Sequence, residues 1–482
     1  MDEQSKVRHD KLKALQTQGR DPFWQTRFDK THYSADIIAR FNVLKDERMS
    51  IAGRITQSRI MGKAAFCHVL DEYGKIQVYV AGDEIGEDEY KQFKDFDLGD
   101  IIGVEGTVFK TNTGEVSIRA IRVVLLAKCL SPIPDKHYGL KDAELRYRNR
   151  HLDLISNLGV REVFKTRTKV ISAIREFFDK RGYMEVETPV LQTIPGGTIA
   201  KPFLTHHNSL DMPMYLRIAV ELFHKRLLVG GLERIYEIGR CFRNEGISHK
   251  HNPEFTMLEF YQTYSDREII MEVFRELIQY VVLKARGTLV VDYQGTKLDL
   301  SGPWKRMTMI QAVKSVTGLD FEKLDEREAL IKVKELKLEL PRTKTWGTLL
   351  YTVFDKMVEK TLIQPTFITG YPVEVAPLVK KSLDNPLVAD MGELFIMGME
   401  IGNSYTEIND PIDQRARFMQ QMAEREKGDD EAMLLDEEFL SALSVGMPPT
   451  GGQGMGVDRL VMLLTDTASI RETLLFPTLR RK

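Results

Sequence analysis

The chain has 482 residues, enough for about two to four domains of ordinary size. Apolar residues make up 43% and charged residues 29%, so the chain can bury a large core and is not an intrinsically disordered protein. Its 68 basic and 70 acidic side chains leave a formal charge of −2, which excludes a histone-like polycation but permits a local nucleic-acid-binding patch.

Cysteine usage and hydropathy indicate a cytoplasmic location. Cys67, Cys129 and Cys241 stand far apart without zinc-site spacing, which is typical of a reducing cytosol rather than of a disulfide framework. The first residues are polar, unlike a signal peptide. No run approaches the roughly 18 apolar residues of a membrane span, so we expect no membrane association.

Residues 1–45 are predicted to form an amino-terminal helical segment. A helix over residues 3–19 is capped by Asp2 and ends at Gly19, with apolar side chains at near-helical spacing. These apolar side chains are Val7, Leu12 and Leu15. The other face carries Lys6, Arg8, Lys11 and Lys13. That face is either solvated or contacts phosphate, and the sequence leaves both readings open.

Residues 46–130 predict a small all-β barrel. Five short runs rich in Val, Ile and Tyr are separated by glycines, and residues 71–74 and 111–114 have the composition of hairpin turns. Five strands in about 80 residues favour the oligonucleotide-binding (OB) barrel. Residues 131–150, which begin with Ser131-Pro132-Ile133-Pro134, are expected to be a linker.

Residues 151–482 predict an α+β domain with a predominantly antiparallel sheet, because regular βαβ alternation is absent. Residues 162–181 read as an amphipathic helix that ends at Gly182. Strands are expected at residues 184–192, 233–244, 255–265 and 392–402. Residues of about 305–345 are helical and charged, and are interpreted as an insertion between core strands.

Two arginines are candidate phosphate ligands. The chain has no P-loop, and the glycines of residues 452–456 lack dinucleotide-loop spacing, so arginines must hold the phosphates of any nucleotide. Arg243 lies in the string FRNEG, where the predicted strand of residues 233–244 passes into a turn. Arg459 follows the glycine loop and precedes an apolar helical run. A guanidinium binds phosphate through two parallel N–H groups and also stacks on a purine.

Two acids are candidate metal ligands. Glu393 and Glu400 lie in one apolar predicted strand, and their odd separation requires a bulge at Gly398 to place them on one face. Carboxylates are costly in such a stretch unless a cation pairs with them. Mg²⁺ that bridges nucleotide phosphates is the natural partner, and a buried glutamate–arginine pair is the alternative.

Three further acids lie among apolar or aromatic neighbours. Each of Glu221, Glu259 and Glu407 taken alone favours a structural role over a binding role. Together they would form a strongly acidic pocket suited to a small cationic substrate.

Three ordered strings resemble the signature motifs of the class II aminoacyl-tRNA synthetases. The first covers residues 182–197 and contains EVETPVLQTIPGG, the second is FRNEGISHKHNPEFTMLEFY at residues 242–261, and the third is GMGVDR at residues 454–459. Their order, the amino-terminal barrel and strings such as LIQPTFITGYP and EIGNSYTEIND are similar to the lysyl subgroup over essentially the whole chain.

The resemblance implies a class II antiparallel sheet flanked by helices, an OB-fold anticodon-binding barrel and a homodimer. It implies ATP-dependent activation of L-lysine and transfer to tRNA(Lys), with Mg²⁺, more than one ion per subunit, as cofactor at Glu393 and Glu400. Arg243 and Arg459 would be the catalytic residues. The implied ATP-binding residues are Arg243, Glu245, His251, Asn252, Phe255 and Arg459.

The resemblance also assigns the amino-acid and anticodon sites. The implied lysine-binding residues are Gly197, Glu221, Arg243, Glu259, Tyr261, Asn403, Tyr405 and Glu407. The implied anticodon-binding residues are Arg59, Phe66, Gln77 and Glu115. The alternatives are a ligase that lysylates a protein, an aspartyl or asparaginyl enzyme, and a non-catalytic nucleic-acid-binding or regulatory protein. Phe66 alone could equally be a core residue of the barrel.

Overall fold

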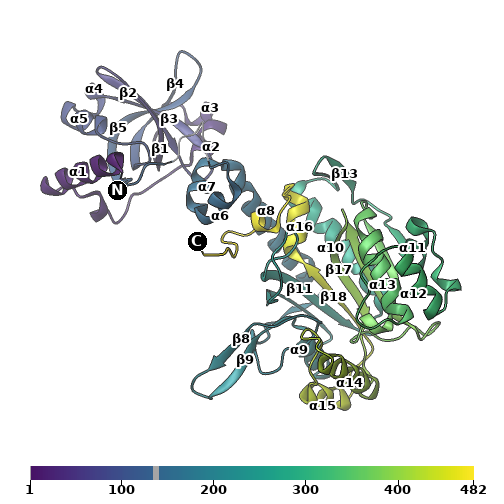
Figure 1. Cartoon of the computed structure of the whole chain (residues 1–482). Helices are drawn as coiled ribbons and strands as arrows, with labels where there is room; N and C mark the ends of the chain where they lie inside the picture. The colour runs from purple at the N-terminus through teal and green to yellow at the C-terminus, as the bar shows by residue number, and fades with distance from the viewer. Residues whose placement is uncertain (1, 134–139, 482) are drawn as a thin grey trace. The chain divides into compact units, whose positions relative to one another are not determined.

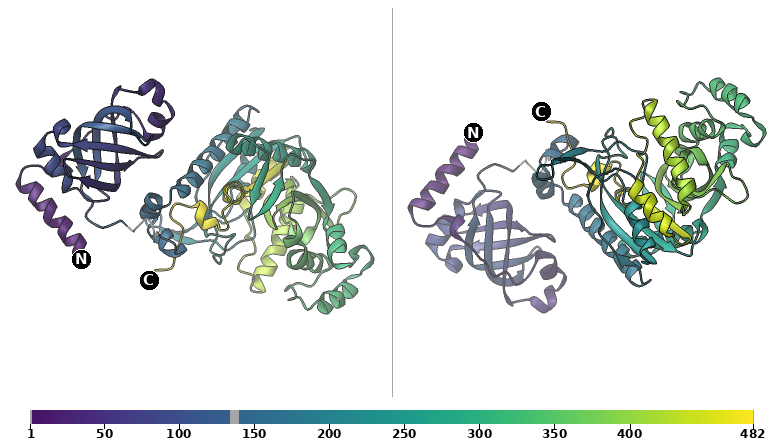
Figure 2. Two further views of the ribbon diagram at one scale, coloured as in Figure 1. Left: turned by 90° about the horizontal axis from the view of Figure 1, so that it is seen from above. Right: turned by 90° about the horizontal axis from the view of Figure 1, so that it is seen from below.

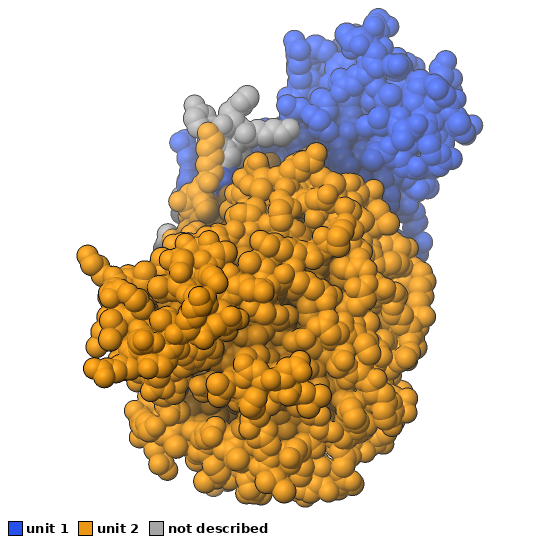
Figure 3. Space-filling view, turned by 90° about the vertical axis from the view of Figure 1, so that its right-hand side faces the viewer, with its two compact units in different colours: residues 1–140 blue, residues 141–482 orange. Residues whose placement is uncertain are grey.

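A computed structural model describes residues 2–133 and 140–481, and the chain divides into two compact units (Figure 3). The first unit is residues 1–140 and the second is residues 141–482. Part of the expected linker, Pro134-Asp135-Lys136, lies outside the described residues. No helix in the described part of the chain is long and apolar enough to cross a membrane.

The first unit is a closed five-stranded barrel, which confirms the predicted OB-type fold (Figure 1). Its strand order is β1-β2-β3-β5-β4. The strands are β1 (Arg48–Met61), β2 (Ala64–Leu70), β3 (Lys75–Ala81), β4 (Ile101–Lys110) and β5 (Val116–Ala127). The short helices around them are η1 (Pro22–Trp24), α2 (Ser34–Ala39), α3 (Phe41–Leu44), α4 (Gly82–Ile85) and α5 (Glu87–Lys94).

The alternating strand residues and the turn residues of the sequence account for this barrel. Alternate residues of β2 face the core, so Cys67 is buried and Phe66 is half-buried on the outer face. Both predicted turns are present: Asp71 N donates to Gly74 O at 2.9 Å, and Thr111 N donates to Glu115 O at 3.0 Å. The two short helices between β3 and β4, α4 and α5, were not predicted.

The amino-terminal helix α1 (Glu3–Thr17) forms as predicted, with the Asp2 carboxylate accepting from Ser5 N. Its buried side differs from the prediction. Val7 is half-exposed, whereas Arg8 is buried and donates to the carbonyls of Leu98 and Cys129. Two of the four basic residues therefore pack on the barrel, because Lys11 also pairs with Asp97 at 2.8 Å.

The second unit is built on an eight-stranded sheet in the order β14-β15-β16-β17-β18-β11-β10-β6 (Figures 1 and 2). All neighbouring strands are antiparallel except the pairs β14–β15 and β6–β10, which confirms the α+β prediction. The strands are β6 (Met184–Glu185), β10 (Arg234–Phe242), β11 (Glu254–Thr263), β14 (Lys305–Thr308), β15 (Thr366–Pro372), β16 (Val388–Ile396), β17 (Met399–Thr406) and β18 (Thr450–Gly456).

The main core lies between this sheet and the helices α8 (Leu158–Asp179), α10 (Arg267–Arg286) and α16 (Val457–Thr465). Helix α8 is the amphipathic helix predicted over residues 162–181. Its Phe178 ring centroid lies 4.9 Å from that of Phe260 on β11, so the helix and the strand that supports the candidate site share one rigid core.

Two expectations about this unit are corrected. Lys305–Thr308 is the edge strand β14 rather than part of the helical insertion, because it pairs in parallel with β15. Residues 309–335 are largely helical as expected, with α11 (Met309–Thr317), η2 (Phe321–Lys323) and α12 (Glu326–Glu335), whereas residues 336–345 form no helix. Residues 184–192 form only β6 and β7 (Leu191–Gln192), since Pro189 offers no N–H to continue a ladder.

Helix formation begins earlier in the second unit than expected. Helix α6 (Ala143–Arg148) lies within the residues predicted as linker, and Tyr147 in it is buried. Helix α7 (Arg150–Ser156) follows, and its buried Arg150 pairs with Asp153 and donates to the carbonyl of Leu474. This hydrogen bond joins the start of the unit to its carboxyl-terminal segment.

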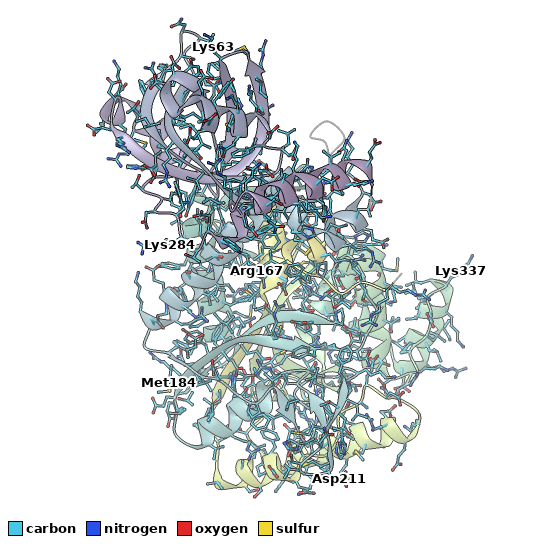
Figure 4. The ribbon with its side chains drawn as sticks, turned by 90° about the vertical axis from the view of Figure 1, so that its left-hand side faces the viewer. Lys63, Arg167, Met184, Asp211, Lys284 and Lys337 are labelled. Atoms are coloured by element: carbon cyan, nitrogen blue, oxygen red, sulfur yellow. The ribbon has the colours of Figure 1, made fainter. Side chains whose placement is uncertain are left out.

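The remaining elements lie around the sheet. The hairpin of β8 and β9 projects from the unit, with Asp211 in its turn (Figures 1 and 4). The further helices and strands are β8 (Leu204–His207), β9 (Met212–Leu216), α9 (Glu221–Val229), β12 (Val290–Tyr293), β13 (Thr296–Asp299), α13 (Trp346–Val353), η3 (Phe354–Val358), η4 (Glu359–Thr361), η5 (Val373–Val375), α14 (Pro411–Glu426), α15 (Glu437–Val445) and η6 (Ile470–Thr473).

Candidate active site

A cavity of about 250 Å³ opens over the middle of the large sheet, between β11, β17, β18 and the loop that follows β10. Nine of the residues singled out from the sequence line it: Arg243, Glu245, His251, Asn252, Phe255, Glu393, Glu400, Asn403 and Arg459. Thr198, Lys250, Met257 and Asp458 also line it and were not predicted. The candidate phosphate ligands and the candidate metal ligands therefore line the same cavity.

Arg243 presents a largely free guanidinium to this cavity. Its backbone N–H donates to Pro253 O at 2.9 Å, which ties the start of the loop to its end. The guanidinium carbon lies 5.1 Å from the centre of the Phe255 ring. Its buried Nε has no hydrogen-bond partner among the residues that the structure describes, so a bound anion would satisfy it.

His251 and Asn252 lie opposite Arg459 of α16. The Arg459 Nη2 atom lies 3.3 Å from His251 Nε2, and Ser248 Oγ lies 2.8 Å from His251 Nδ1. Burial and the nearby Arg459 charge lower the pKa of His251, which favours the neutral imidazole. Asn252 donates to Glu254 O at 2.6 Å but leaves its buried Oδ1 unpaired. Asn252 therefore has hydrogen-bonding capacity left for a ligand, whereas both ring nitrogens of His251 already have polar neighbours.

The two candidate metal ligands lie on neighbouring strands, not on one strand. Met397 and Gly398 both have positive φ and form the turn between β16 and β17. The expected bulge at Gly398 is therefore wrong. The register instead passes from Leu394 opposite Gly402 to Phe395 opposite Glu400, so Ile401 is the bulged residue.

Glu393 and Glu400 are held close enough to influence each other. Burial, followed by the Glu400 charge, raises the pKa of Glu393 well above its ordinary value. The Tyr371 hydroxyl donates to Glu393 at 2.7 Å, and Arg459 Nη1 lies 3.4 Å from Glu400 Oε2. Hard oxygen donors with unmatched negative charge suit Mg²⁺, which takes its other ligands from substrate phosphates. Among residues 2–133 and 140–481, no group of three or more metal-ligating side chains is present.

The glycines at residues 452–456 belong to strand β18 rather than to a loop. A side chain at Gly452 would collide with the Glu407 carboxylate and the Tyr261 ring, and one at Gly454 would lie 2.8 Å from Asn403 Oδ1. Glycine is thus required here by close packing under the site, not by turn conformation. The buried Asp458 that follows accepts from Thr256 N at 2.7 Å and pairs with Arg167 of α8.

The three acids Glu221, at the start of α9, Glu259, on β11, and Glu407, directly after β17, are all buried and close together. Burial and the Glu221 charge raise the pKa of Glu259 to about 7, although Tyr261 donates to it at 2.8 Å. Burial also raises the pKa of Glu407 to about 8. Gly197 packs against Glu221: a Cβ atom added at Gly197 would lie 3.3 Å from Glu221 Cβ.

The acidic cluster contains a cation that the sequence reading missed. Lys225 of α9 is fully buried, and its Nζ lies 2.5 Å from Glu221 Oε1 and 2.6 Å from Glu407 Oε2. The spacing of Glu221 and Lys225 by four residues on one helix was the available signal. Tyr405 is half-buried on β17, and burial raises its pKa well above the ordinary value.

The predicted anticodon residues cluster on the barrel of the first unit. Arg59, Phe66 and Gln77 line a second cavity, of about 780 Å³. Glu115 accepts from Gln77 Nε2 at 2.8 Å and lies 3.0 Å from His68 Nε2. The Phe66 ring is 5.1 Å from that of Tyr79 and faces outward, so it is not a core residue of the barrel.

Comparison with known proteins defines the class. A family model described as tRNA synthetases class II (D, K and N) matches residues 142–480. A model described as OB-fold nucleic acid binding domain matches residues 49–126. The chain belongs to the class II tRNA synthetases of this group, enzymes that charge tRNA with an amino acid in an ATP-dependent reaction.

Within the group, the chain is similar to curated lysine–tRNA ligases. It is 51% identical to that of Thermoanaerobacter sp. (strain X514), over 100% of this chain and 97% of the relative. It is 50% identical to that of Bacillus subtilis (strain 168), over 100% of this chain and 98% of the relative. It is 51% identical to that of Carboxydothermus hydrogenoformans (strain ATCC BAA-161 / DSM 6008 / Z-2901), over 100% and 98%.

Proposed function

We propose that the chain activates L-lysine with ATP and transfers the lysyl group to the 3′ end of tRNA(Lys), with release of pyrophosphate and AMP. The observation that carries the choice of amino acid is the buried cluster of Glu221, Glu259 and Glu407 beside the nucleotide-sized cavity. The three buried carboxylates outnumber the single ammonium of Lys225 that pairs with them, so they match a cationic substrate better than an anionic or neutral one. The names of the full-length relatives agree with this choice.

In the first step, a carboxylate oxygen of lysine attacks the α-phosphorus of ATP, and the bond from that phosphorus to the pyrophosphate oxygen breaks. The attacking carboxylate is already ionised, so the site needs no general base; positioning and charge neutralisation carry the rate. We assign Arg243 to both the lysine carboxylate and the α-phosphate, since its guanidinium faces the cavity with Nε unpaired.

The adenine ring would lie between Phe255 and Arg459, in a cation–π and stacking arrangement. Both side chains line the cavity. Glu245, His251 and Asn252 would hydrogen-bond the adenine or the phosphates, and the unpaired Asn252 Oδ1 supports this.

Glu393 and Glu400 would hold Mg²⁺, with more than one ion per subunit. When bound, Mg²⁺ would neutralise charge that develops on the phosphate oxygens. The donor set fits this role because both groups are carboxylates and burial beside Glu400 disfavours an uncompensated charge on Glu393.

The lysine side chain would extend from Arg243 into the acidic cluster. We assign Glu407 and Tyr261 to the ε-ammonium, Tyr405 to the aliphatic stem and Asn403 to the vicinity of the carboxylate. Glu221, Glu259 and the Gly197 backbone would bind the α-ammonium. The close approach of Gly197 to Glu221 supports the second grouping, and the position of Glu407 and Tyr261 against the same glycine, Gly452, supports the first.

The barrel would read the anticodon through Arg59, Phe66, Gln77 and Glu115. Its exposed aromatic face can stack on a base, and the polar groups beside it can hydrogen-bond base edges. Single-stranded anticodon bases are the kind of RNA that proteins recognise in this way.

We further propose a cytoplasmic homodimer that uses the segment of residues 182–197. Met184 and Leu191 in this segment are 52% and 46% exposed, and Met184 lies at the surface of the second unit (Figure 4). Exposed apolar side chains of this kind mark protein interfaces.

Pyrophosphate exchange into ATP, with each of the protein amino acids in turn, tests the proposal. We expect lysine-dependent exchange, and we expect Glu407→Gln to raise KM for lysine about tenfold or more while KM for ATP stays unchanged. The exposed Glu438→Gln is the matched control. Exchange that depends on aspartate or asparagine, or a Glu407→Gln enzyme with wild-type lysine kinetics, would refute the assignment.

A further inference from the structure

Lys225 lies at the centre of the acidic cluster, where three separate parts of the fold meet. Its Nζ atom contacts Glu221 of its own helix α9 at 2.5 Å and Glu407, just after β17, at 2.6 Å. The carbonyl of Leu378 lies 3.3 Å away. Glu259 and Tyr261 of β11 and Tyr405 of β17 are the further titratable groups that face these two carboxylates.

The ammonium is charged in spite of its burial. Burial alone would lower the pKa of Lys225, but Glu221 and Glu407 outweigh this effect and the pKa is raised. An ammonium this deep is retained only when its partners compensate the loss of water. The side chain is therefore a fixed positive charge among the acids rather than a neutral amine.

The charges of the cluster match those of one lysine molecule. Three carboxylates and one resident ammonium leave an excess of two negative charges when all are ionised. Free lysine carries two ammonium groups, and its carboxylate is assigned to Arg243. Without Lys225, the same three carboxylates would exceed the substrate's positive charge by one.

We propose that Lys225 is a positioning residue for amino-acid recognition, whose ammonium fixes Glu221 and Glu407 and sets the charge of the pocket to complement two substrate ammonium groups. This inference rests on the proposed function, because it assumes that lysine binds among these acids. It adds a residue that does not itself touch lysine.

The Glu407 carboxylate shows why positioning is needed. Neither of its oxygens has a well-aligned hydrogen bond, although Oε2 is in ion-pair contact with Lys225. Gly452 lies so close to Oε1 that any side chain there would displace it. Lys225 therefore restrains Oε2, while Oε1 remains available to a ligand.

The test compares variants at residue 225 in pyrophosphate exchange. Lys225→Met removes the charge and keeps an unbranched side chain that is one atom shorter, and Lys225→Ala leaves space for a small cation. Arg226→Ala, next along the same helix and paired with Glu438 at the surface, is the matched control. Saturation with lysine and with ATP is measured separately for each enzyme.

We expect Lys225→Met to raise KM for lysine about tenfold or more, with KM for ATP and the control enzyme unchanged. Propylammonium should lower the lysine KM of Lys225→Ala toward the wild-type value, and 1-propanol should not. Equal rises in both KM values, wild-type lysine kinetics in Lys225→Met, or equal rescue by 1-propanol would overturn the inference.

Two further comparisons keep the result interpretable. If Lys225→Met does not fold, the charge-retaining Lys225→Arg decides: a displaced guanidinium should raise KM for lysine alone, and an unchanged KM would overturn the inference. Wild-type enzyme without lysine-dependent exchange would refute the proposed function, whereas failure confined to the residue 225 variants would refute only the role of Lys225.

Discussion

The Arg459 guanidinium donates a hydrogen bond of 2.5 Å from Nη1 to the backbone carbonyl of Glu400. An arginine of α16 and a carboxylate-bearing residue of β17 are thereby fixed against each other at the wall of the cavity. Because this side chain is already ordered before any ligand arrives, little conformational entropy remains to oppose phosphate or adenine binding. In a site that works by charge neutralisation, preorganised donors of this kind supply most of the stabilisation of the transition state.

Arg459→Ala should lower pyrophosphate exchange by about 10²–10³-fold, the usual loss when one preorganised donor to developing charge is removed. The exposed Arg286→Ala at the end of α10 should leave exchange unchanged. Comparison of kcat and KM for ATP in the two enzymes measures the effect. Near-wild-type exchange in Arg459→Ala would remove Arg459 from the catalytic assignment.

Glu393→Gln should raise the Mg²⁺ concentration needed for half-maximal exchange by about tenfold or more, because a charged oxygen ligand is replaced by a neutral one. The measurement is a Mg²⁺ titration at fixed ATP and lysine. Glu339→Gln, an exposed glutamate of the second unit, is the control. An unchanged Mg²⁺ requirement in Glu393→Gln would favour the alternative of a glutamate–arginine pair.

Lysine affinity should depend on pH through Glu259. Burial and the Glu221 charge raise its pKa to about 7, so the carboxyl is largely neutral below that pH and ionised above it. Only the ionised form attracts an ammonium group, and lysine Kd should therefore fall as pH rises from about 6 to about 8. Calorimetric titration across this range measures it.

The Glu259→Gln enzyme provides the comparison for that pH profile. Its lysine Kd should be weaker throughout and should lose the part of the pH dependence that is centred near pH 7, since the amide does not titrate. Parallel pH profiles for the wild type and the variant would assign the dependence to another group.

Phe66→Ala should reduce kcat/KM for tRNA charging and leave pyrophosphate exchange intact, because the ring lies on the barrel and not in the cavity of the second unit. Loss of one stacked base costs about 1–3 kcal/mol, or roughly 5- to 150-fold. Phe23→Ala, an exposed ring of the same unit outside the barrel cavity, is the control. Equal loss of charging and exchange would indicate a structural role.

The barrel could be predicted because its signals are local. Residues 66 and 67 alternate between the outer face and the core, and the turns at Asp71 and Thr111 are built from side chains within four residues of each other. The conformation of each strand, and which of its faces is buried, can therefore be predicted from its own sequence, before its partner strands are known.

The relation between Glu393 and Glu400 could be predicted only in part. Their pairing was predicted because two acids occur in one apolar stretch of sequence. The turn at Met397 and Gly398 within that stretch was not predicted. Such a turn lacks the usual Asn-Gly or Asp-Gly sequence, so a continuous strand with a bulge was the simpler expectation.

The roles of Lys225 and of the glycines of β18 could be recognised only in the tertiary structure. The contact between Lys225 and Glu407 joins residues far apart in the chain, and no periodicity reports it. Gly452 reads as a loop residue until the Tyr261 ring and the Glu407 carboxylate are seen to fill the space a side chain would need. Close packing of this kind is a property of the assembled sheet.

The most direct test of the central claim is charging of purified tRNA with labelled amino acid by the whole chain in the presence of ATP and Mg²⁺. We predict that labelled lysine becomes attached to the 3′ end of tRNA(Lys), while labelled aspartate and asparagine do not become attached to their own tRNAs. Charging of tRNA with aspartate or asparagine, or lysine activation without any transfer to tRNA(Lys), would contradict the proposed function.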